Sequence, residues 1–447
     1  MNSCGTPLRE RTGKRNMMIG KRISGRMNLV LAAVLLALLT VCSAAAGEEA
    51  PDLTQQCEVR ICYSSRRGDH MTDGDYVSYW ESNRMQHPWV ILTSDTPMYG
   101  LYLCFRQLPS SFELQTLQIT PGEEEGTFTE EWIPLTEGDT RFQHTFYELP
   151  GVKSVRIYST QTSSHKIGIF ELYAFGKGEI PGWVQRWQET EGKADLMFFS
   201  AHPDDELLFY GGAIPTYAGE MKKRVVVAYL TYGNPARRTE ALNGLWAAGV
   251  RHYPEFGGFQ DTYSSKVQDA YRTLGKTKVL DWVTKMVRKH RPEVIVTLDL
   301  NGEYGHGQHR MMGDAAIQVW DLAADASQYP DSAAQYGTWQ VQKLYIHLYG
   351  DETNQTRFDW NVPLESFGGK TSLEVTKEAY ALHKTQENAK VKINHKWTLL
   401  SIEETGTAFS NTTFGLYASR VGPDETHTDF LEHIGEEIII QTEKKDE

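Results

Sequence analysis

Hydrophobic and polar positions follow two different patterns along this chain of 447 residues. Between residues 57 and 176, short apolar runs with alternating polar positions are separated by turns rich in Gly, Pro, Ser and Asp. The clearest runs begin at Trp89, Leu101, Val155 and Ile167. Short strands spaced regularly over about 120 residues are typical of an all-β sandwich. The pattern therefore predicts an all-β domain in the first part of the chain.

A second domain is predicted over residues 193–390, where continuous apolar runs take turns with helical patterns. Such runs are typical of strands that are buried on both faces. We expect strands at 195–200, 225–230, 293–298 and 343–348, and helices at 206–218, 236–248, 274–289 and 311–324. This alternation predicts a Rossmann-like α/β domain, with a parallel sheet and helices on both faces. Residues 177–192 would form a linker, and the pattern assigns no role to a C-terminal extension at 391–447.

The first 46 residues have the order of a secretory signal peptide. Basic residues precede an apolar run from Leu29 to Cys42, and the small residues 43–46 follow it. We expect cleavage near Ala46 and a secreted or cell-surface protein, with a leader of bacterial type. A retained membrane anchor is the alternative, although the run is shorter than the about 20 residues that span a bilayer. No later stretch predicts a transmembrane helix.

Charge and cysteine content exclude some classes of function. The net charge is −13, which argues against a nucleic-acid partner because such proteins need a clustered basic face. Three cysteines lie beyond the leader, namely Cys57, Cys62 and Cys104. In an oxidising compartment they allow one disulfide and one free thiol, and the pairing stays open. The lack of a Cys-x-x-Cys pair excludes thioredoxin-type chemistry.

Histidines and carboxylates follow two of the predicted strands. Ala201-His-Pro-Asp-Asp-Glu206 leaves the first strand, and residues 301–309, with His306 and His309, leave the third. Because ligands bind at the carboxyl ends of parallel strands, we expect the two loops to meet at one site. A His, a carboxylate three residues later and a distant His suit a catalytic zinc. The alternative is that the acidic residues only cap the following helix.

The same stretches, Ala201–Glu206 and Gly305–His309, resemble the PIG-L/LmbE superfamily of zinc-dependent N-deacetylases. The resemblance covers roughly residues 193–390 and implies that His202, Asp205 and His309 bind the metal. It further implies that Asp204 is the general base and that His306 stabilises the oxyanion or protonates the leaving amine. The family's second motif is closer to His-Pro-Asp-His, whereas Gly307-Gln308 stands between the histidines here. The implied cofactor is Zn²⁺, and Fe²⁺ stays an alternative.

Two further residues follow from this resemblance. It extends through Arg237-Arg238-Thr239-Glu240 to Asp261 and on to His383–Gln386. Arg238 and Asp261 occupy positions where family members contact sugar hydroxyls. The alternative is a salt bridge on a helix face for Arg238 and a loop cap for Asp261.

The first domain resembles the discoidin (coagulation factor 5/8 type C) modules, which have a galactose-binding-like jelly-roll fold. The resemblance rests on Met71–Ser82, with its Asp-Gly turn and Trp, and on His87–Leu92. It implies a jelly roll that either binds a glycan or only supports the neighbouring domain.

Taken together, the sequence predicts a secreted, metal-dependent hydrolase that removes an N-acetyl group from an amino sugar in a glycan or glycoconjugate. One alternative is a hydrolase of the same fold that acts on another N-acyl or ester group. The other is a glycan-binding surface protein whose hydrolase-like domain is inactive. Residues Asp204, His306 and His309 favour an enzyme, because binding alone does not need them.

Overall fold

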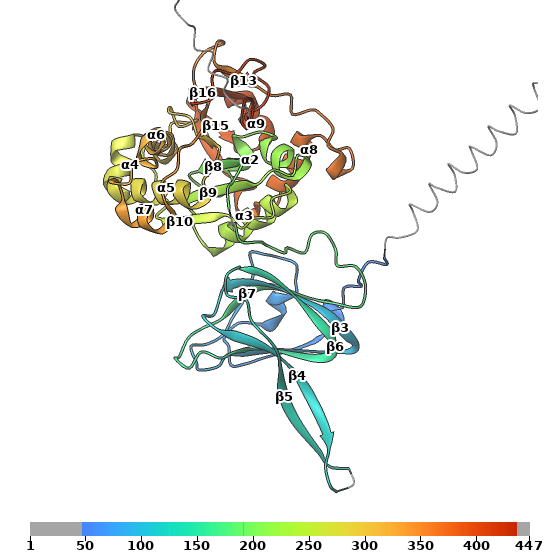
Figure 1. Ribbon diagram of the computed structural model, residues 1–447. Helices are drawn as coiled ribbons and strands as arrows, with labels where there is room; N and C mark the ends of the chain where they lie inside the picture. The colour runs from blue at the N-terminus through green and yellow to red at the C-terminus, as the bar shows by residue number, and fades with distance from the viewer. Residues whose placement is uncertain (1–46, 125, 191, 436–447) are drawn as a thin grey trace, which may run out of the picture.

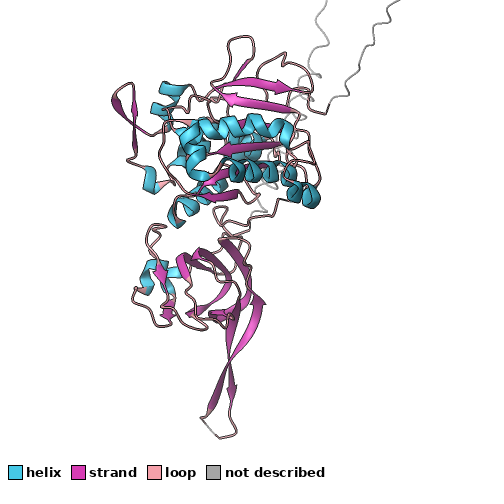
Figure 2. Ribbon diagram, turned by 90° about the vertical axis from the view of Figure 1, so that its left-hand side faces the viewer, coloured by secondary structure: helices cyan, strands magenta, loops and turns pink. Residues whose placement is uncertain are grey.

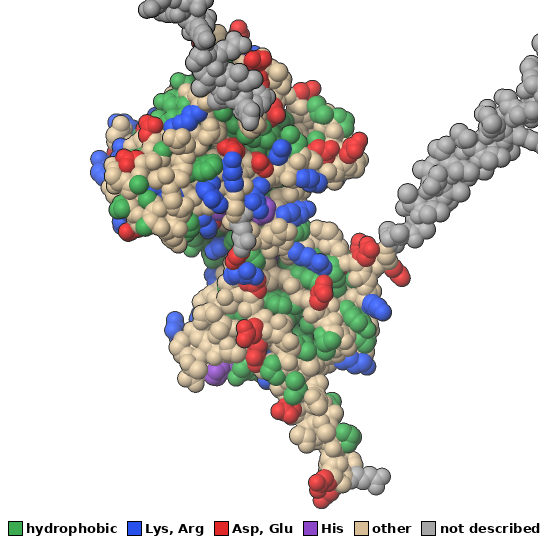
Figure 3. All heavy atoms as spheres, in the orientation of Figure 1, with side chains coloured by type: hydrophobic (Ala, Val, Ile, Leu, Met, Phe, Trp, Pro, Cys, Tyr) green, Lys and Arg blue, Asp and Glu red, His purple; other side chains and the backbone are tan. Residues whose placement is uncertain are grey.

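The computed structural model describes residues 47–124, 126–190 and 192–435. It shows an all-β domain followed by an α/β domain (Figures 1 and 2), and the molecule narrows where the two meet (Figure 3). The predicted signal peptide lies outside the described residues. Within them, no helix is long and apolar enough to cross a membrane.

The first domain consists of one antiparallel sheet, in which two strands are long and two others have only two to four residues. Its strands are β1 (Glu58–Ile61), β2 (Trp80–Glu81), β3 (Trp89–Gln107), β4 (Phe112–Pro121), β5 (Phe128–Glu137), β6 (His144–Ser159) and β7 (Gly168–Phe175). Their order is β2-β7-β3-β6-β4-β5, and β1 pairs with β3. The register of β3 against β6 shifts between Thr93 and Gly100, and such irregularities bend a strand. The all-β prediction is confirmed, but the runs at Trp89 and Leu101, predicted as two short strands, lie in the single strand β3. The jelly-roll assignment stays a prediction.

The three cysteines of this domain form no disulfide, and its β4–β5 hairpin points away from the α/β domain. Cys57, Cys62 and Cys104 are all free thiols, so the disulfide that the sequence allowed is not formed. The β4–β5 hairpin projects away from the α/β domain (Figure 1). Its tip is therefore remote from the boundary between the domains.

The second domain is built on a mixed sheet of seven strands. These are β8 (Leu196–Ser200), β9 (Val225–Thr231), β10 (Glu255–Phe259), β11 (Val294–Thr297), β12 (Lys343–His347), β13 (Gln355–Arg357) and β16 (Thr413–Ser419). The order is β10-β9-β8-β11-β12-β16-β13. The first five are parallel, as predicted, but β16 runs antiparallel to β12 and β13. The segment beyond residue 390 therefore adds a strand to this sheet.

Helices cover the sheet (Figure 2). They are α2 (Asp205–Leu208), α3 (Pro235–Ala247), α4 (Val267–Leu274), α5 (Lys276–His290), α6 (Gly307–Leu322), α7 (Pro330–Tyr336), α8 (Ser372–Tyr380) and α9 (Ile402–Phe409). Three of them, α3, α5 and α6, lie where the sequence predicted helices. A small hairpin pairs β14 (Lys390–Ile393) with β15 (Lys396–Leu399).

The helix predicted at 206–218 is wrong. The structure has the four residues of α2 and then a separate π-helical turn at Pro215–Glu220. Gly211 lies between them with φ of +57°, a left-handed conformation that ends an α-helix. A Cβ atom at Gly211 would lie 2.2 Å from Nε1 of Trp360, so no larger residue fits there. The tryptophan is supplied by a distant segment, which the periodicity did not indicate.

The last described residues complete the core of the α/β domain. Phe430 is fully buried, with ring centroids 4.7 Å from Tyr345 and 5.6 Å from Tyr217. Nearby, the buried ammonium of Lys343 pairs with the carboxylate of Asp424, which also accepts a hydrogen bond of 2.6 Å from the Tyr345 hydroxyl. Segment 424–430 is therefore held by both apolar and charged contacts.

The Phe430→Ala substitution should lower the free energy of unfolding by about 3–5 kcal/mol, because it leaves a cavity among packed aromatic rings. Denaturant unfolding followed by circular dichroism measures this change. Phe128→Ala is the matched control, since Phe128 is 65% exposed at the remote hairpin and its loss should change stability by less than about 0.5 kcal/mol. Equal stabilities for the two variants would contradict the placement of Phe430.

Candidate metal centre

The two predicted loops meet at the carboxyl ends of β8 and β11. These strands are neighbours in parallel register, with Phe199 opposite Thr297. The loop after β8 carries His202, and the loop after β11 leads into α6, where His309 lies in the first turn. Sheet pairing therefore brings together side chains that are about 100 residues apart in the sequence, as was expected from the strand order.

Three donor groups lie at the distances that a tetrahedral metal requires, with Oδ1 of Asp205 nearer His309 and Oδ2 nearer His202. Nδ1 of His202 is 3.2 Å from Nε2 of His309. The Asp205 carboxylate lies 3.3 Å from the same His309 atom and 3.4 Å from the same His202 atom. Ligands about 2.0–2.1 Å from a tetrahedral zinc lie about 3.3 Å from one another. The predicted set of His202, Asp205 and His309 therefore fits a metal ion.

Hydrogen bonds set the proton positions on both imidazoles. Nε2 of His202 is 2.8 Å from Oε1 of Gln308, and the Gln308 amide is oriented by a bond of 2.8 Å from its Nε2 to the Gln260 carbonyl. Nδ1 of His309 is 2.6 Å from the Glu303 carboxylate. Each outer nitrogen donates, so the second nitrogen of each ring faces the other ring and Asp205. Lone pairs on both inner nitrogens beside a carboxylate repel one another, and either a proton on His202 or a bound cation removes this repulsion.

The pKa values of the ligand residues show the same preference for positive charge. Burial lowers the pKa of His202, but the carboxylates of Asp205 and Asp261 outweigh burial and raise it to about 10. Burial raises the pKa of Asp205, yet the two imidazoles of His309 and His202 outweigh it and hold it well below its usual range. Asp205 also accepts backbone N–H bonds from Ala201 and His202, at 3.0 and 2.7 Å. These bonds fix its position beside the histidines.

His306 lies close enough to take part in the same centre. Its ring and those of His202 and His309 each offer one atom, and these three atoms all lie within 4.8 Å of one another. Nδ1 of His306 accepts a bond of 3.2 Å from the Gln308 backbone N–H at the start of α6. Burial, aided by the two other histidines, lowers its pKa to about 3, so the ring is neutral with its proton on Nε2. In this state His306 can donate one hydrogen bond.

Asp204 is held beside the ligands by a strained backbone and an arginine. Its φ of 129° is rare for a residue with a side chain. Nη2 of Arg237 lies 3.0 Å from its Oδ1 and donates a second bond of 2.7 Å to the Pro203 carbonyl. Burial raises the pKa of Asp204, while Arg237 acts in the opposite direction. The Asp204–Arg237 ion pair therefore places a proton acceptor, the Asp204 carboxylate, next to the candidate metal ligands. The carboxylate itself is not one of these ligands in the predicted set.

The structure brings only one of the two predicted sugar-contacting residues to the centre. Asp261 lies 3.4 Å from Nε2 of His202 and 3.3 Å from Nη1 of Arg237, with its side chain 35% exposed. Arg238 instead donates a bond of 3.2 Å to the Tyr253 hydroxyl and stacks on Phe256. Adjacent residues of a helix point in different directions, so α3 can present only one of the two arginines to the centre.

Two residues that sequence reasoning did not assign support the ligands. Glu303 lies between His309 and His347, with its second oxygen 3.0 Å from Nδ1 of His347. All three side chains are fully buried. In the sequence, His347 stands alone, without another histidine at metal-ligand spacing. Its place at the carboxyl end of a strand next to β11 was the signal that could have linked it to the centre.

Comparison with known proteins agrees with this geometry. Residues 197–320 match the PIG-L family model, described as GlcNAc-PI de-N-acetylase. A 1D-myo-inositol 2-acetamido-2-deoxy-alpha-D-glucopyranoside deacetylase 1 from Frankia casuarinae is 31% identical over 179 residues. This alignment covers 34% of the chain and 57% of the relative, so the chain spans little more than half of the relative's length. The resemblance to PIG-L is thus confirmed for the segment that carries the candidate metal centre.

Two solved structures are similar at low identity. One is an N,N'-diacetylchitobiose deacetylase from Pyrococcus horikoshii, with 19% identity, a TM-score of 0.31, and coverage of 43% of this chain and 71% of that chain. The other is a chitosan-binding module from Paenibacillus sp. IK-5, with 16% identity, a TM-score of 0.23, and coverage of 28% and 99%. Neither similarity assigns a function to this chain, and the discoidin resemblance stays a prediction.

The His309→Ala variant should lose its metal, because it removes one of three donors that lie at ligand distances. The unmodified protein, loaded with Zn²⁺ and freed of excess metal, should hold one zinc ion per chain as measured by inductively coupled plasma mass spectrometry. His395→Ala is the control, since His395 is an exposed residue of the β14–β15 turn. Full occupancy in the His309→Ala protein would remove His309 from the ligand set.

Glu303→Gln should keep the fold but weaken Zn²⁺ binding by roughly 10- to 100-fold, because the charged acceptor of His309 is replaced by a neutral one. Competition with a chromogenic chelator measures the affinity. Glu378→Gln is the matched control, with a side chain that is 59% exposed. An unchanged affinity in Glu303→Gln would show that this carboxylate does not orient the ligand.

Proposed function

We propose that the protein is a metal-dependent hydrolase that removes the N-acetyl group from an N-acetylglucosamine-type sugar. The observation that carries this proposal is the pair of inner nitrogens on His202 and His309, 3.2 Å apart beside Asp205, with Asp204 next to them. The printed name of the Frankia relative, a deacetylase of a 2-acetamido-2-deoxy-glucopyranoside, supports the choice of sugar. On the leader-like residues 1–46, we also propose that it acts outside the cytoplasm.

His202, Asp205 and His309 would hold the metal, which when bound supplies a Lewis acid and raises the acidity of a nearby water. Asp204 takes the proton from the water that attacks the acetyl carbon. Because Arg237 pairs with Oδ1 of Asp204, we assign the proton to Oδ2. Arg237 also keeps the carboxylate turned toward the centre through its bond to the Pro203 carbonyl. Asp204 therefore acts as a general base from a preset position.

His306 stabilises the charge that develops on the acetyl oxygen. Its neutral ring holds a proton on Nε2, because Nδ1 accepts the Gln308 backbone N–H. A donor that is already in place needs no rearrangement when negative charge forms on the substrate. The C–N bond then breaks, and the proton held by Asp204 passes to the leaving nitrogen. The products are acetate and a free amino sugar, so atoms and protons balance.

The substrate approaches along the side formed by Asp261 and Tyr263. The Tyr263 side chain is 75% exposed and contacts the His306 ring edge-on, with the centroids 5.2 Å apart. Asp261 is the partly exposed carboxylate on this side, and it accepts a bond from Arg237. We assign to Asp261 a contact with a sugar hydroxyl. Arg238 is not given this role, because it packs against Phe256.

The two alternatives differ in what they require of this centre. A hydrolase of another N-acyl or ester group would use the same residues, and only the substrate panel separates it from a deacetylase. A purely glycan-binding protein has no need of Asp204 in a conformation that costs on the order of 1–3 kcal/mol. The strained Asp204 therefore favours an enzyme.

Zinc-loaded protein should release acetate from one or more sugars of a panel that includes N-acetylglucosamine, N-acetylgalactosamine, chitin oligomers, peptidoglycan fragments and inositol glycosides. Asp204→Asn should keep the metal and the fold but lower kcat by about 10²- to 10⁴-fold, since the proton acceptor is lost. A coupled enzymatic assay for acetate measures the release by the unmodified protein and the lower kcat of the variant.

Asp321→Asn is the matched control, because its side chain is 90% exposed, and its activity should equal that of the unmodified protein. Acetate release that survives in Asp204→Asn would remove this residue from the base role. If the metal-loaded protein releases no acetate from any sugar of the panel, the deacetylase proposal is wrong.

A further inference from the structure

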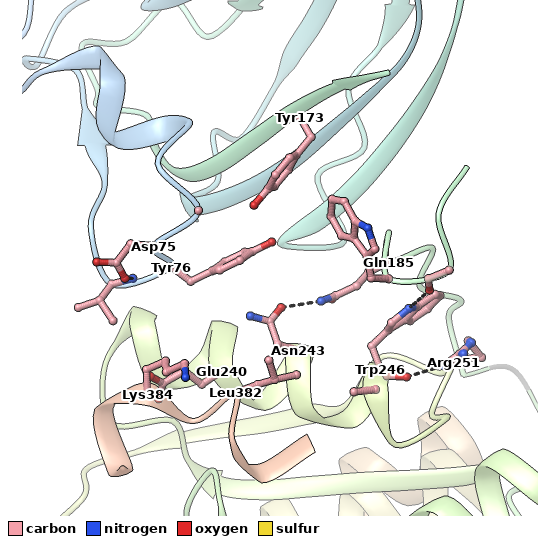
Figure 4. Close-up of a pocket in the computed structure, with 15 residues that line it drawn as sticks. Asp75, Tyr76, Tyr173, Gln185, Glu240, Asn243, Trp246, Arg251, Leu382 and Lys384 are labelled. Atoms are coloured by element: carbon pink, nitrogen blue, oxygen red, sulfur yellow. Dashed lines mark hydrogen bonds between the residues drawn. The ribbon is translucent and has the colours of Figure 1, made fainter. Parts of the chain in front are cut away.

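A cavity of about 830 Å³ lies between the two domains, apart from the metal centre. The all-β domain contributes the loop Gly74–Val77 and Tyr173, and the linker contributes Trp183. The α/β domain contributes Asn243 and Trp246 of α3, with Leu382 beyond α8. Figure 4 shows Tyr76 and Tyr173 on one side, facing Asn243, Trp246 and Leu382 on the other. We call this the interdomain cavity.

Apolar side chains are left exposed in this cavity. Trp183 is 46% exposed, and Val77 and Leu382 are 44% and 36% exposed. The Trp183 ring stands edge-on to Tyr173, with centroids 4.9 Å apart and planes at 70°. This contact holds the indole in place although nearly half of it faces solvent. Large apolar surface gathered in a concave place marks a binding site.

The polar groups of the cavity are few and oriented. Nε2 of Gln185 in the linker donates a bond of 2.6 Å to Oδ1 of Asn243 (Figure 4). This bond turns the Asn243 amide so that its NH₂ group is the donor for a ligand. Two charged residues with opposite signs, Asp75 and Lys384, also line the cavity. Aromatic faces with a few directed polar groups suit a pyranose, whose C–H face stacks on rings while its hydroxyls bind amides and carboxylates.

The remaining charged residues of the cavity are already paired. The Glu240 carboxylate accepts bonds of 2.7 and 2.6 Å from Thr385. The Arg251 guanidinium lies 3.9 Å from the centroid of the Trp246 ring and donates to the backbone carbonyls of Trp246 and Val250. No excess of free cations is left among these residues to hold a phosphate. The balance of charge favours a neutral ligand.

Helix α3 connects the interdomain cavity with the metal centre. Arg237 in its first turn contacts Asp204, while Glu240, Asn243 and Trp246 follow at intervals of three residues. With a rise of 1.5 Å per residue, Asn243 lies about 9 Å from Arg237 along the helix axis. Because six residues of an α-helix turn by about 600°, Asn243 faces a side about 120° from that of Arg237. A chain that extends from a sugar at the metal centre would therefore pass around α3 to reach the cavity.

We propose that the interdomain cavity binds a neutral oligosaccharide, as the site for sugar units that follow the N-acetylated unit at the metal centre. The placement of that unit rests on the proposed deacetylase function, whereas the binding of sugar in the cavity does not. The substrate class is accordingly an oligosaccharide, and both domains contribute to its recognition.

The test compares a short and a long substrate in the Trp183→Ala variant of the full-length, zinc-loaded protein. For the tetramer of N-acetylglucosamine, kcat/KM should fall by about tenfold or more, mainly through KM, because the stacking surface is lost. For the monomer, kcat/KM should stay within about twofold of the unmodified protein, since it does not reach the cavity. Trp183→Tyr should restore most of the activity on the tetramer. Phe128→Ala, an exposed aromatic at the remote hairpin, is the control and should affect neither substrate.

Binding gives a readout that does not depend on turnover. Isothermal titration calorimetry on the Asp204→Asn protein should detect binding of the tetramer. The double variant with Asp204→Asn and Trp183→Ala should bind it about tenfold more weakly. Tetramer binding that is lost with Trp183, together with no acetate release by the zinc-loaded protein in which Asp204 is intact, would support the cavity and overturn the deacetylase function. Equal effects of Trp183→Ala on monomer and tetramer, or tetramer binding that ignores Trp183, would overturn the cavity as a sugar site and leave the deacetylase function standing.

Discussion

The need for positive charge among three buried groups is the constraint on which the site depends. His202 and His309 turn their inner nitrogens toward each other at 3.2 Å, and Asp205 adds a carboxylate within 3.4 Å of both. A proton on His202 supplies this charge when no metal is bound, since burial lowers the pKa of His202 but the neighbouring carboxylates outweigh burial and raise it to about 10. The protein holds the arrangement because Gln308 and Glu303 occupy the outer nitrogens and so decide which nitrogen of each ring is free.

The framework around this constraint is rigid for reasons that start in the sheet. The pairing of β8 with β11 sets the distance between the two loops, and the first turn of α6 presents His309. Glu303 ties that histidine to His347 at the end of β12, so three adjacent strands share one buried network. A metal bound there would be held by secondary structure rather than by flexible loops, which suits a centre that must keep its geometry during turnover.

Helix α3 gives the two domains a common element. Its first turn supplies Arg237, which orients Asp204, and its later turns line the interdomain cavity with Asn243 and Trp246. Arg238 points to the other side and packs on Tyr253 and Phe256. In our proposal, one helix thus carries both the residue that positions the general base and the residues that hold the far end of the substrate.

The sequence by itself predicted the four strands β8, β9, β11 and β12, the helices α3, α5 and α6, and the two loops that meet at the candidate metal centre, because apolar runs and the His-Pro-Asp-Asp motif are local signals. It did not indicate the break after α2, where Trp360 approaches Gly211, or the antiparallel β16 between β12 and β13. Helical periodicity also could not decide between Arg237 and Arg238. These features depend on contacts between segments far apart in the chain, and only the folded arrangement fixes which side chains meet.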